Sequence, residues 1–469
     1  MTAPAAAVSD PVGVDRRKFL LPLALAQFIC SFAGSNMNVM INDISEDLDT
    51  DVQGVQLAIT SFLLIMAILM IPASKLTDRW GRKRCFIGGL TLYGIGALLS
   101  ALAPGLGVLI LGNSVLEGVG TALLIPPVYI LATIAFSDVT SRARAFGVIS
   151  GLGGIGAAAG PLIGGLIATA ISWRAAFLFQ ALVVAAIIVL SRRMVDPLPA
   201  DPTRPFDALG AILSAVGMFC VVLGILQADS NVVLMALLLA VGLAFLIGFF
   251  LHIRSRERAG KEPLLSTQLF RNRVSNLALA TQNAQWLVLM GTSFTVAVYL
   301  QTVRGYNPIE TGAIFTAATV GVLVSSLAAE RLAKRRTQKS LIIAGFVATA
   351  AGVALLIGLV WAWSSIAAFV PGLLLIGLGV GVMLTPSVNV VQSSWPEELQ
   401  GEISGLSRSV SNLGSTFGTA IAGTILLADL TKGTYALAMV ALAVVAVLGL
   451  VAALFMPAGP KPREAGSPS

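Results

Sequence analysis

The sequence has 469 residues, of which 56% are hydrophobic and only 11% charged, and its mean hydropathy is +0.89. Soluble domains carry about 25% charged residues, so this chain lacks the polar surface that soluble domains need. The net charge of +7 does not indicate nucleic-acid binding, because the basic residues lie in short clusters between apolar runs. One His and three Cys exclude a zinc framework or a disulfide scaffold. The composition therefore predicts an all-α polytopic membrane protein.

Fourteen apolar segments are long enough to cross a bilayer, which takes about 20 residues in a helix. In chain order we expect crossings at 19–41, 53–73, 84–103, 107–134, 144–168, 173–191, 207–227, 231–252, 274–302, 310–329, 340–360, 365–391, 402–427 and 435–456. The segments 103–107 and 229–231 are the shortest turns between crossings. Residues 1–18 and 457–469 are expected to be disordered tails.

Lys and Arg are concentrated in every second loop between the predicted crossings, and this distribution predicts the orientation of the chain in the membrane. With both termini cytoplasmic, the inside segments hold clusters such as 16–18, 75–84, 192–204, 254–273 and 331–339, whereas the outside segments hold only Arg174, Arg304 and Lys432. The first outside loop is instead acidic, from Asp43 to Asp51. Because cytoplasmic loops carry the excess of Lys and Arg, we expect a cytoplasmic-membrane protein with both ends inside.

The two halves of the chain resemble one another at a nearly constant spacing. Residues 76–83 align with 332–339, Gly118 and Gly120 align with Gly377 and Gly379, and Gly156 and Gly160 align with Gly414 and Gly418. Duplicated bundles around a midplane site are typical of secondary transporters. We therefore expect two six-helix bundles, at 19–195 and 274–456, separated by two extra helices at 207–252 and the cytoplasmic linkers 196–206 and 253–273.

The sequence contains no Walker loop, Rossmann glycine fingerprint or HExxH helix. We therefore expect no cofactor, metal or nucleotide, and energy drawn from an ion or substrate gradient. The expected partners are the lipid bilayer and a small organic substrate, and we expect a monomer. A membrane-embedded enzyme is disfavoured, because the only His, His252, lies at a helix end.

The segment 74–84 carries a dense motif with the spacing D-R-x-G-R-K. Its members are Asp78, Arg79, Gly81, Arg82 and Lys83. It resembles the signature loop of the major facilitator superfamily, with Ser74 where Gly is usual. An Asp among cations at two helix ends can pair with Arg or face a helix N-terminus, which suits a gating latch; the alternative is a solvated basic loop.

A second motif lies in the fifth predicted crossing and consists of Gly156, Gly160, Pro161, Gly164 and Gly165. It resembles the antiporter motif of exporters in the same superfamily. Glycines four apart let helices approach closely, and proline permits bending; ordinary small-residue packing is the alternative. With fourteen crossings, Trp173-Arg174 and the 301–312 segment, the chain resembles the fourteen-helix branch of the drug:proton antiporters.

Four positions depart from that branch. Ala33 stands where an Asp is usual, Ser114 and Glu117 replace the Arg and Gln of the R-x-x-Q-G pattern, and Ser411 stands where Arg is frequent. Proton coupling therefore cannot be transferred by resemblance alone.

Glu117 is the proton-coupling candidate, because it lies ten residues inside its crossing, about 15 Å deep. Acids at such depth are costly and usually functional, and a low dielectric favours the protonated form. The alternative is a permanently protonated carboxyl hydrogen-bonded between helices. At helical spacing Asn113, Glu117 and Thr121 share one face. Arg408, one turn before Ser411, could pair with a carboxylate or extend to the cytoplasm.

Polar residues in the first, fourth, ninth and thirteenth crossings are expected to line a substrate cavity, or else to join helices. They are Gln27, Ser31, Asn38, Asn113, Gln282, Asn283, Gln285, Trp286 and Asn412. Amides with few charges suit amphipathic organic molecules. We therefore predict a drug exporter that works by alternating access in exchange for protons. The alternative is an uncoupled or differently coupled carrier of lipids or metabolites.

Overall fold

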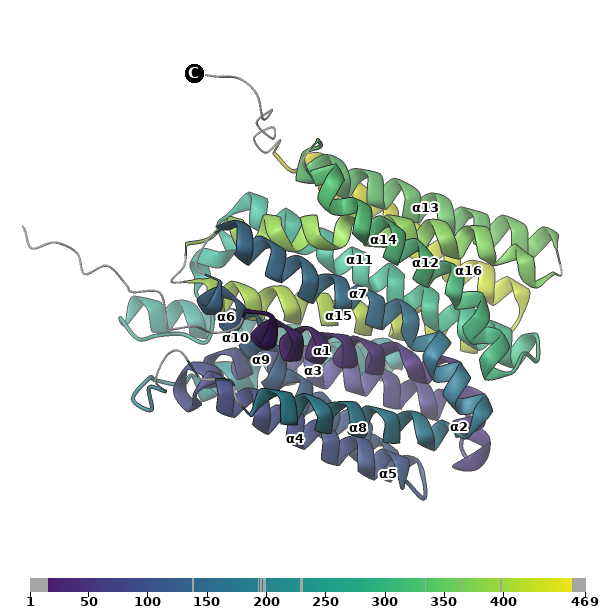
Figure 1. The fold of residues 1–469 in the computed structure, drawn as a ribbon, viewed down its shortest axis with the longest axis horizontal. Helices are drawn as coiled ribbons and strands as arrows, with labels where there is room; N and C mark the ends of the chain where they lie inside the picture. Colours follow the sequence, from purple (N-terminus) through teal and green to yellow (C-terminus); the bar gives the residue numbers. More distant parts are fainter. Residues whose placement is uncertain are drawn as a thin grey trace, which may run out of the picture.

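The computed structural model describes residues 16–136, 139–192, 194, 196, 200–227, 231–333, 335–363, 365–396 and 399–457. These residues form helices joined by short turns (Figure 1). The helices of the first half are α1 (Arg16–Asn36), η1 (Met37–Val39), α2 (Ile41–Asp47), α3 (Val52–Trp80), α4 (Arg82–Ala101), α5 (Leu106–Leu109), η2 (Ile110–Glu117), α6 (Gly118–Ala135), α7 (Val139–Ala170) and α8 (Trp173–Ser191). The remaining helices are α9 (Ala208–Leu226), α10 (Val232–Arg258), η3 (Thr267–Phe270), α11 (Arg273–Val298), η4 (Tyr299–Val303), α12 (Pro308–Ala333), α13 (Gln338–Ala362), η5 (Ile366–Ala368), α14 (Val370–Ser393), α15 (Gln400–Leu427) and α16 (Lys432–Phe455).

Fourteen of the described helical segments are long and apolar enough to cross a membrane, which confirms the predicted number. Several crossings combine two or three helices: α5, η2 and α6 form the fourth, and α11 with η4 forms the ninth. The short turn at 102–105 separates α4 from α5. The second short turn, at 229–231, lies mostly outside the described residues, but α9 and α10 on either side of it are separate helices.

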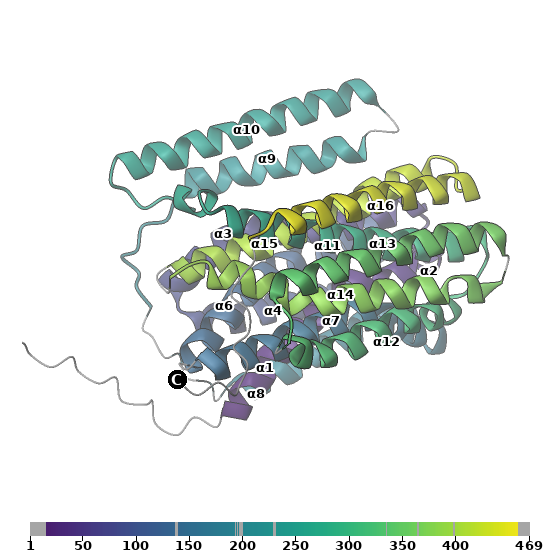
Figure 2. The same ribbon diagram turned by 90° about the horizontal axis from the view of Figure 1, so that it is seen from above.

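The crossings gather into two bundles. Helices α1, α3, α4, α6, α7 and α8 pack together, and so do α11 to α16. The bundles meet along two helix pairs, α3 with α15 and α7 with α12. The two extra helices, α9 and α10, pack on each other and form a separate layer beside α3 and α15 (Figure 2).

Glycine contacts repeat between the bundles at the spacing that the sequence predicts. A Cβ on Gly89 would lie 2.6 Å from the Gly120 carbonyl oxygen, and a Cβ on Gly345 would lie 2.7 Å from that of Gly379. These contacts join α4 to α6 and α13 to α14, which are equivalent positions in the two halves. The close approach of helix backbones at small residues thus explains why the glycines recur, and it supports the internal repeat.

The motif segment 74–84 is almost entirely helical, which corrects the loop expected there. Helix α3 continues to Trp80 and α4 begins at Arg82, so that Gly81 alone forms the turn. Its φ of 94° lies in the left-handed region that favours glycine. We call the end of the molecule that carries Gly81 and the linkers 200–207 and 259–272 the basic end, and the end that carries α2 the opposite end.

Candidate substrate cavity and gate

A small cavity lies between the bundles, with walls from α1, α3, α6, α11 and α15. Its lining residues are Gln27, Cys30, Ser31, Gly34, Leu63, Met66, Met70, Thr121, Ile125, Trp286, Met290, Arg408, Ser411, Asn412 and Ser415. Its volume is about 40 Å³, whereas pockets for drug-sized ligands measure about 300–1,000 Å³. The bundles are therefore closed around this cavity, which has room for little more than water.

Four of the nine predicted cavity residues line it, namely Gln27, Ser31, Trp286 and Asn412. Arg408 lies among them. The sequence led us to expect that it pairs with a carboxylate or extends to the cytoplasm; in the structure it binds Tyr129 instead. Its guanidinium carbon lies 4.2 Å from the centre of the Tyr129 ring, and its Nη2 donates to the Tyr129 hydroxyl. That hydroxyl donates to Gln27 Oε1 at 3.1 Å, and Gln27 Nε2 donates to Ser31 at 3.1 Å. The chain of contacts links α15 of one bundle to α6 and α1 of the other.

The other five predicted cavity residues lie outside its lining in this conformation. Gln282 accepts from Ser407 at 2.8 Å, Asn283 donates to the Val410 carbonyl at 2.9 Å, and Gln285 accepts from Ser387 at 3.2 Å; these bonds hold α11 to α15 and α14. Asn38 donates to Ser293 at 3.1 Å near the opposite end, and Asn113 is buried beside α4. Gln282, Asn283, Gln285 and Asn38 thus form hydrogen bonds between helices, the alternative that the sequence left open, whereas the Asn113 amide has no hydrogen-bond partner among the described residues.

Glu117 is fully buried and faces α4, away from the cavity lining. Its Oε1 accepts from Ser100 Oγ at 3.4 Å, and its Oε2 has no hydrogen-bond partner among the described residues. Gly96 of α4 makes room for it, since a Cβ there would lie 2.9 Å from Glu117 Cγ. Cys30 and Thr121 line the cavity, whereas Glu117 does not.

The helix that carries Glu117 explains this position. Residues Ile110–Glu117 form a π-helix, whose i→i+5 bonds widen the turn. The common face expected for Asn113, Glu117 and Thr121 assumed α-helical spacing throughout, and the π-helix breaks that spacing. As a result Thr121 reaches the cavity whereas Glu117 does not.

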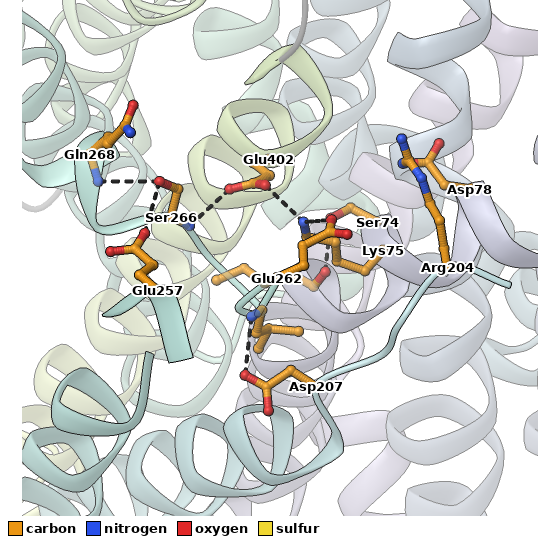
Figure 3. A network of polar contacts seen from close by, with 12 residues as sticks. Ser74, Lys75, Asp78, Arg204, Asp207, Glu257, Glu262, Ser266, Gln268 and Glu402 are labelled. Carbon is orange, nitrogen blue, oxygen red and sulfur yellow. Dashed lines mark hydrogen bonds and ion pairs between the residues drawn. The ribbon is translucent and has the colours of Figure 1, made fainter. Parts of the chain in front are cut away.

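At the basic end a polar network joins the two bundles through Lys75. Its Nζ lies 2.7 Å from Glu402 Oε1 at the start of α15 and 2.9 Å from Glu262 in the linker after α10. The second oxygen of Glu402 accepts from the Ser266 backbone at 2.8 Å, and Ser266 Oγ donates to Glu257 at 3.1 Å. Figure 3 shows Lys75 between the two glutamates, with Glu402 reaching toward the 257–268 segment. We call these five residues the basic-end network.

The predicted gating residues lie beside this network, on the first bundle. Asp78 pairs with Arg82 at 2.5 Å and with Arg204 of the 200–207 linker at 2.6 Å. Lys83 donates from Nζ to the Arg192 carbonyl at 3.0 Å, and from its backbone to Asp196 at 3.0 Å. Arg79 is half-buried on the last turn of α3, and Gly81 forms the turn. The ion pair that joins the two bundles here is formed by Lys75 and Glu402, neither of which is among the predicted gating residues.

The glycines of the antiporter-type motif lie on two sides of α7. Gly156, Gly160 and Gly164 face the backbone of α1, where a Cβ on Gly164 would lie 3.1 Å from Asn36 Cβ. Gly165 and Pro161 face α12 of the other bundle, and a Cβ on Gly312 would lie 2.6 Å from the Pro161 carbonyl oxygen. The motif therefore permits two close helix contacts, one within a bundle and one between bundles.

Contacts between the bundles also close the opposite end. Gln301 Nε2 donates to the Asn38 carbonyl at 2.7 Å, and Gln56 Nε2 donates to the Thr419 carbonyl at 3.2 Å. The Ile309 backbone donates to Thr169 at 3.0 Å. With contacts at both ends and a contracted cavity, the structure represents an occluded conformation.

Two repeated helical bundles with a cavity between them are typical of secondary transporters. Comparison with known sequences agrees, because the profile of the Major Facilitator Superfamily matches residues 23–419 and 282–469. The chain belongs to this superfamily, and is thus a transporter rather than an enzyme.

Relatives match over most of the chain. The puromycin resistance protein pur8 of Streptomyces alboniger is 30% identical over 88% of this chain and 82% of its own length. The multidrug resistance protein Stp of Mycobacterium tuberculosis is 28% identical over 88% and 76%, and the multidrug efflux pump LfrA of Mycolicibacterium smegmatis is 29% identical over 87% and 80%. The crystal structure of the human organic anion transporter MFSD10 (TETRAN) has the same fold, with a TM-score of 0.65 at 13% identity over 94% of this chain and 100% of that one.

Proposed function

We propose that this protein exports hydrophobic or amphipathic organic compounds, drugs among them, across the cytoplasmic membrane in exchange for protons. The main support is that relatives named for drug resistance and efflux match across nearly 90% of the chain. The cavity supports the proposal in its chemistry, since Trp286 and three methionines line it together with Gln27 and Asn412. Such a mixed lining suits amphipathic molecules.

In this proposal the basic end and both termini face the cytoplasm, as the distribution of Lys and Arg indicates. The two bundles move around the cavity between a state open to the cytoplasm and a state open to the outside. Binding of substrate or protons shifts the populations of these two states. Opening to the cytoplasm separates Lys75 from Glu402, while the contacts of Gln301 and Gln56 hold the opposite end closed. Opening outward reverses the two sets of contacts.

Glu117 is the proposed proton carrier. It is the only acidic residue in the described crossings that lies more than a few residues from the end of its crossing. One of its oxygens is buried with no hydrogen-bond partner among the described residues, which costs little free energy for a protonated carboxyl but much for a carboxylate. Release of the proton then requires that η2 move the carboxyl past Cys30 and Thr121 toward a hydrated cavity. Because π-helical turns often occur at functional sites, η2 is a suitable element for this movement.

The test uses purified protein in liposomes with an imposed pH gradient. Glu117→Gln keeps the shape of a protonated carboxyl but cannot release a proton, so gradient-driven transport should stop while substrate exchange without a gradient continues. Glu46→Gln, the same change at an exposed site, is the control and should behave as wild type. Gradient-driven transport at the wild-type rate in Glu117→Gln would remove Glu117 from the coupling.

A second candidate function, an uncoupled or differently coupled carrier, is favoured by two observations. Glu117 does not line the cavity, and Ala33 stands where the branch usually carries an acid. The two functions differ in substrate-induced proton release, which a pH-sensitive dye reports in lightly buffered protein. An antiporter releases protons on substrate addition, and a carrier of the second kind releases none.

A further inference from the structure

The charge in the lining of the central cavity is positive. Among the described residues that line it, Arg408 is the only one with a charged side chain, and the smaller adjoining cavity is lined by Arg408 as well. The remaining polar lining consists of neutral amides and hydroxyls, such as Gln27, Ser411 and Asn412. Glu117 is buried but does not line the cavity, and in the protonated form proposed above it carries no charge.

Arg408 contacts the ring and the hydroxyl of Tyr129. None of the ion pairs between described residues includes Arg408, so it has no carboxylate partner in the part of the chain that the structure describes. A guanidinium has five N–H donors in a planar fork, so donors remain that can face the cavity. A partly buried cation without a counter-ion is electrostatically unfavourable, and an entering anion would relieve this.

We propose that the preferred substrates are amphipathic organic anions, with a carboxylate or phenolate that binds Arg408 and an aromatic body that packs on the apolar lining. This inference rests on the proposed export function and specifies its substrate class. The fork of arginine matches a carboxylate in bidentate geometry. Trp286 offers an aromatic face, and Met66, Met70 and Met290 offer flexible, polarisable contacts.

Tyr129 holds the arginine in place for this role. Its ring lies under the guanidinium, and its hydroxyl is fixed by Gln27 at 3.1 Å. An anion that replaces the hydroxyl as acceptor would leave the stacked ring in position, so that Arg408 stays aimed into the cavity. A cationic substrate of the same size would instead face Arg408 with no carboxylate in the lining to offset the repulsion.

The experiment compares two dyes that share a xanthene ring system but differ in charge, fluorescein as the anion and rhodamine 123 as the cation. Transport is measured with the full chain in liposomes, and binding is measured separately in detergent by fluorescence polarisation. Wild type should bind and move fluorescein at least about ten-fold better than rhodamine 123. Arg408→Gln should lose about ten-fold in fluorescein binding and transport while rhodamine 123 is unchanged or improved. Arg408→Lys keeps the charge but loses the planar fork, so its fluorescein activity should lie between those of Arg408→Gln and wild type.

The outcomes separate the inference from the proposed function. Preference of wild type for rhodamine 123, or an equal loss for both dyes in Arg408→Gln, overturns the substrate class and leaves export intact. Equal losses in Arg408→Gln and Arg408→Lys would likewise reduce Arg408 to a structural role. Failure of wild type to move either dye, or any member of a wider panel of drugs, overturns the export function itself.

Discussion

Removal of the Lys75–Glu402 pair should open the basic end. The two atoms lie 2.7 Å apart and the side chains are only 13% and 16% exposed, so the pair is intermediate between a surface pair, worth about 0–1 kcal/mol, and a buried one, whose disruption costs about 3–5 kcal/mol. We take about 2 kcal/mol as the free energy by which the pair stabilises the closed basic end. Because the pair joins helices of different bundles, that energy favours the closed basic end, and its loss should shift the equilibrium about 30-fold toward the open state.

The measurement is a distance distribution between spin labels at residues 84 and 338. Arg84 on α4 and Gln338 on α13 are both exposed, and they lie on different bundles. The labels are placed in a background without the three native cysteines. Lys75→Gln and Glu402→Gln should each add a population at longer distance, and the double variant should add little more, because either change already breaks the pair.

Glu262→Gln is the matched control. It removes the other carboxylate of Lys75, which is 39% exposed and lies in the linker after α10, so its effect should be clearly smaller. Distance distributions that are identical in wild type, Lys75→Gln and Glu402→Gln would refute the role of this pair in holding the bundles together.

Two further predictions concern the stability of the fold. Burial raises the pKa of Asp207, but hydrogen bonds from His252, Gly210 and Leu264 outweigh it and lower that pKa overall; the stabilisation is thus present at neutral pH and is lost as the pH falls below about 4. The melting temperature in detergent should fall at acid pH in wild type and depend less on pH in Asp207→Asn. The same dependence of melting temperature on pH in both proteins would contradict this contribution of Asp207. Gly156→Val places a side chain against the Phe28 carbonyl and should cost about 1–3 kcal/mol, measured as a lower melting temperature. Gly151→Ala on the same helix meets nothing within 4 Å and should be neutral, so equal melting of both variants would contradict the close α1–α7 packing.

The crossings and the repeat were predictable because both follow from local sequence. Apolar length sets the number of crossings, and close backbone contact restricts positions such as Gly120 and Gly379 to glycine. The ends of the helices were less predictable. Charged residues such as Lys75 and Asp78 lie beyond the apolar stretch but still continue the hydrogen bonding of α3, up to the turn at Gly81.

The cavity was predictable only in part. The spacing of Gln27 and Ser31 places both side chains on one face of the first crossing, and in the structure both line the cavity. Spacing alone does not determine which neighbour a polar face meets, so Gln282 was assigned to the cavity although it bonds within its own bundle. The position of Glu117 depends on a π-helix, which no pattern in the sequence indicates.

The gate was the least predictable feature. Lys75 and Glu402 are 327 residues apart in the chain, and either one alone is an ordinary charge near the end of a crossing. The same holds for Arg408 and Tyr129, which come from different bundles. Such pairs arise from the way the bundles face each other, and therefore become visible only in the folded structure.

Export driven by proton exchange can be measured as accumulation of a fluorescent drug in liposomes under pH gradients of either sign. We expect accumulation against the drug's own gradient only when protons move in the opposite direction, and no accumulation once an ionophore has abolished the pH gradient. Equal drug movement under both gradients and without one would contradict it.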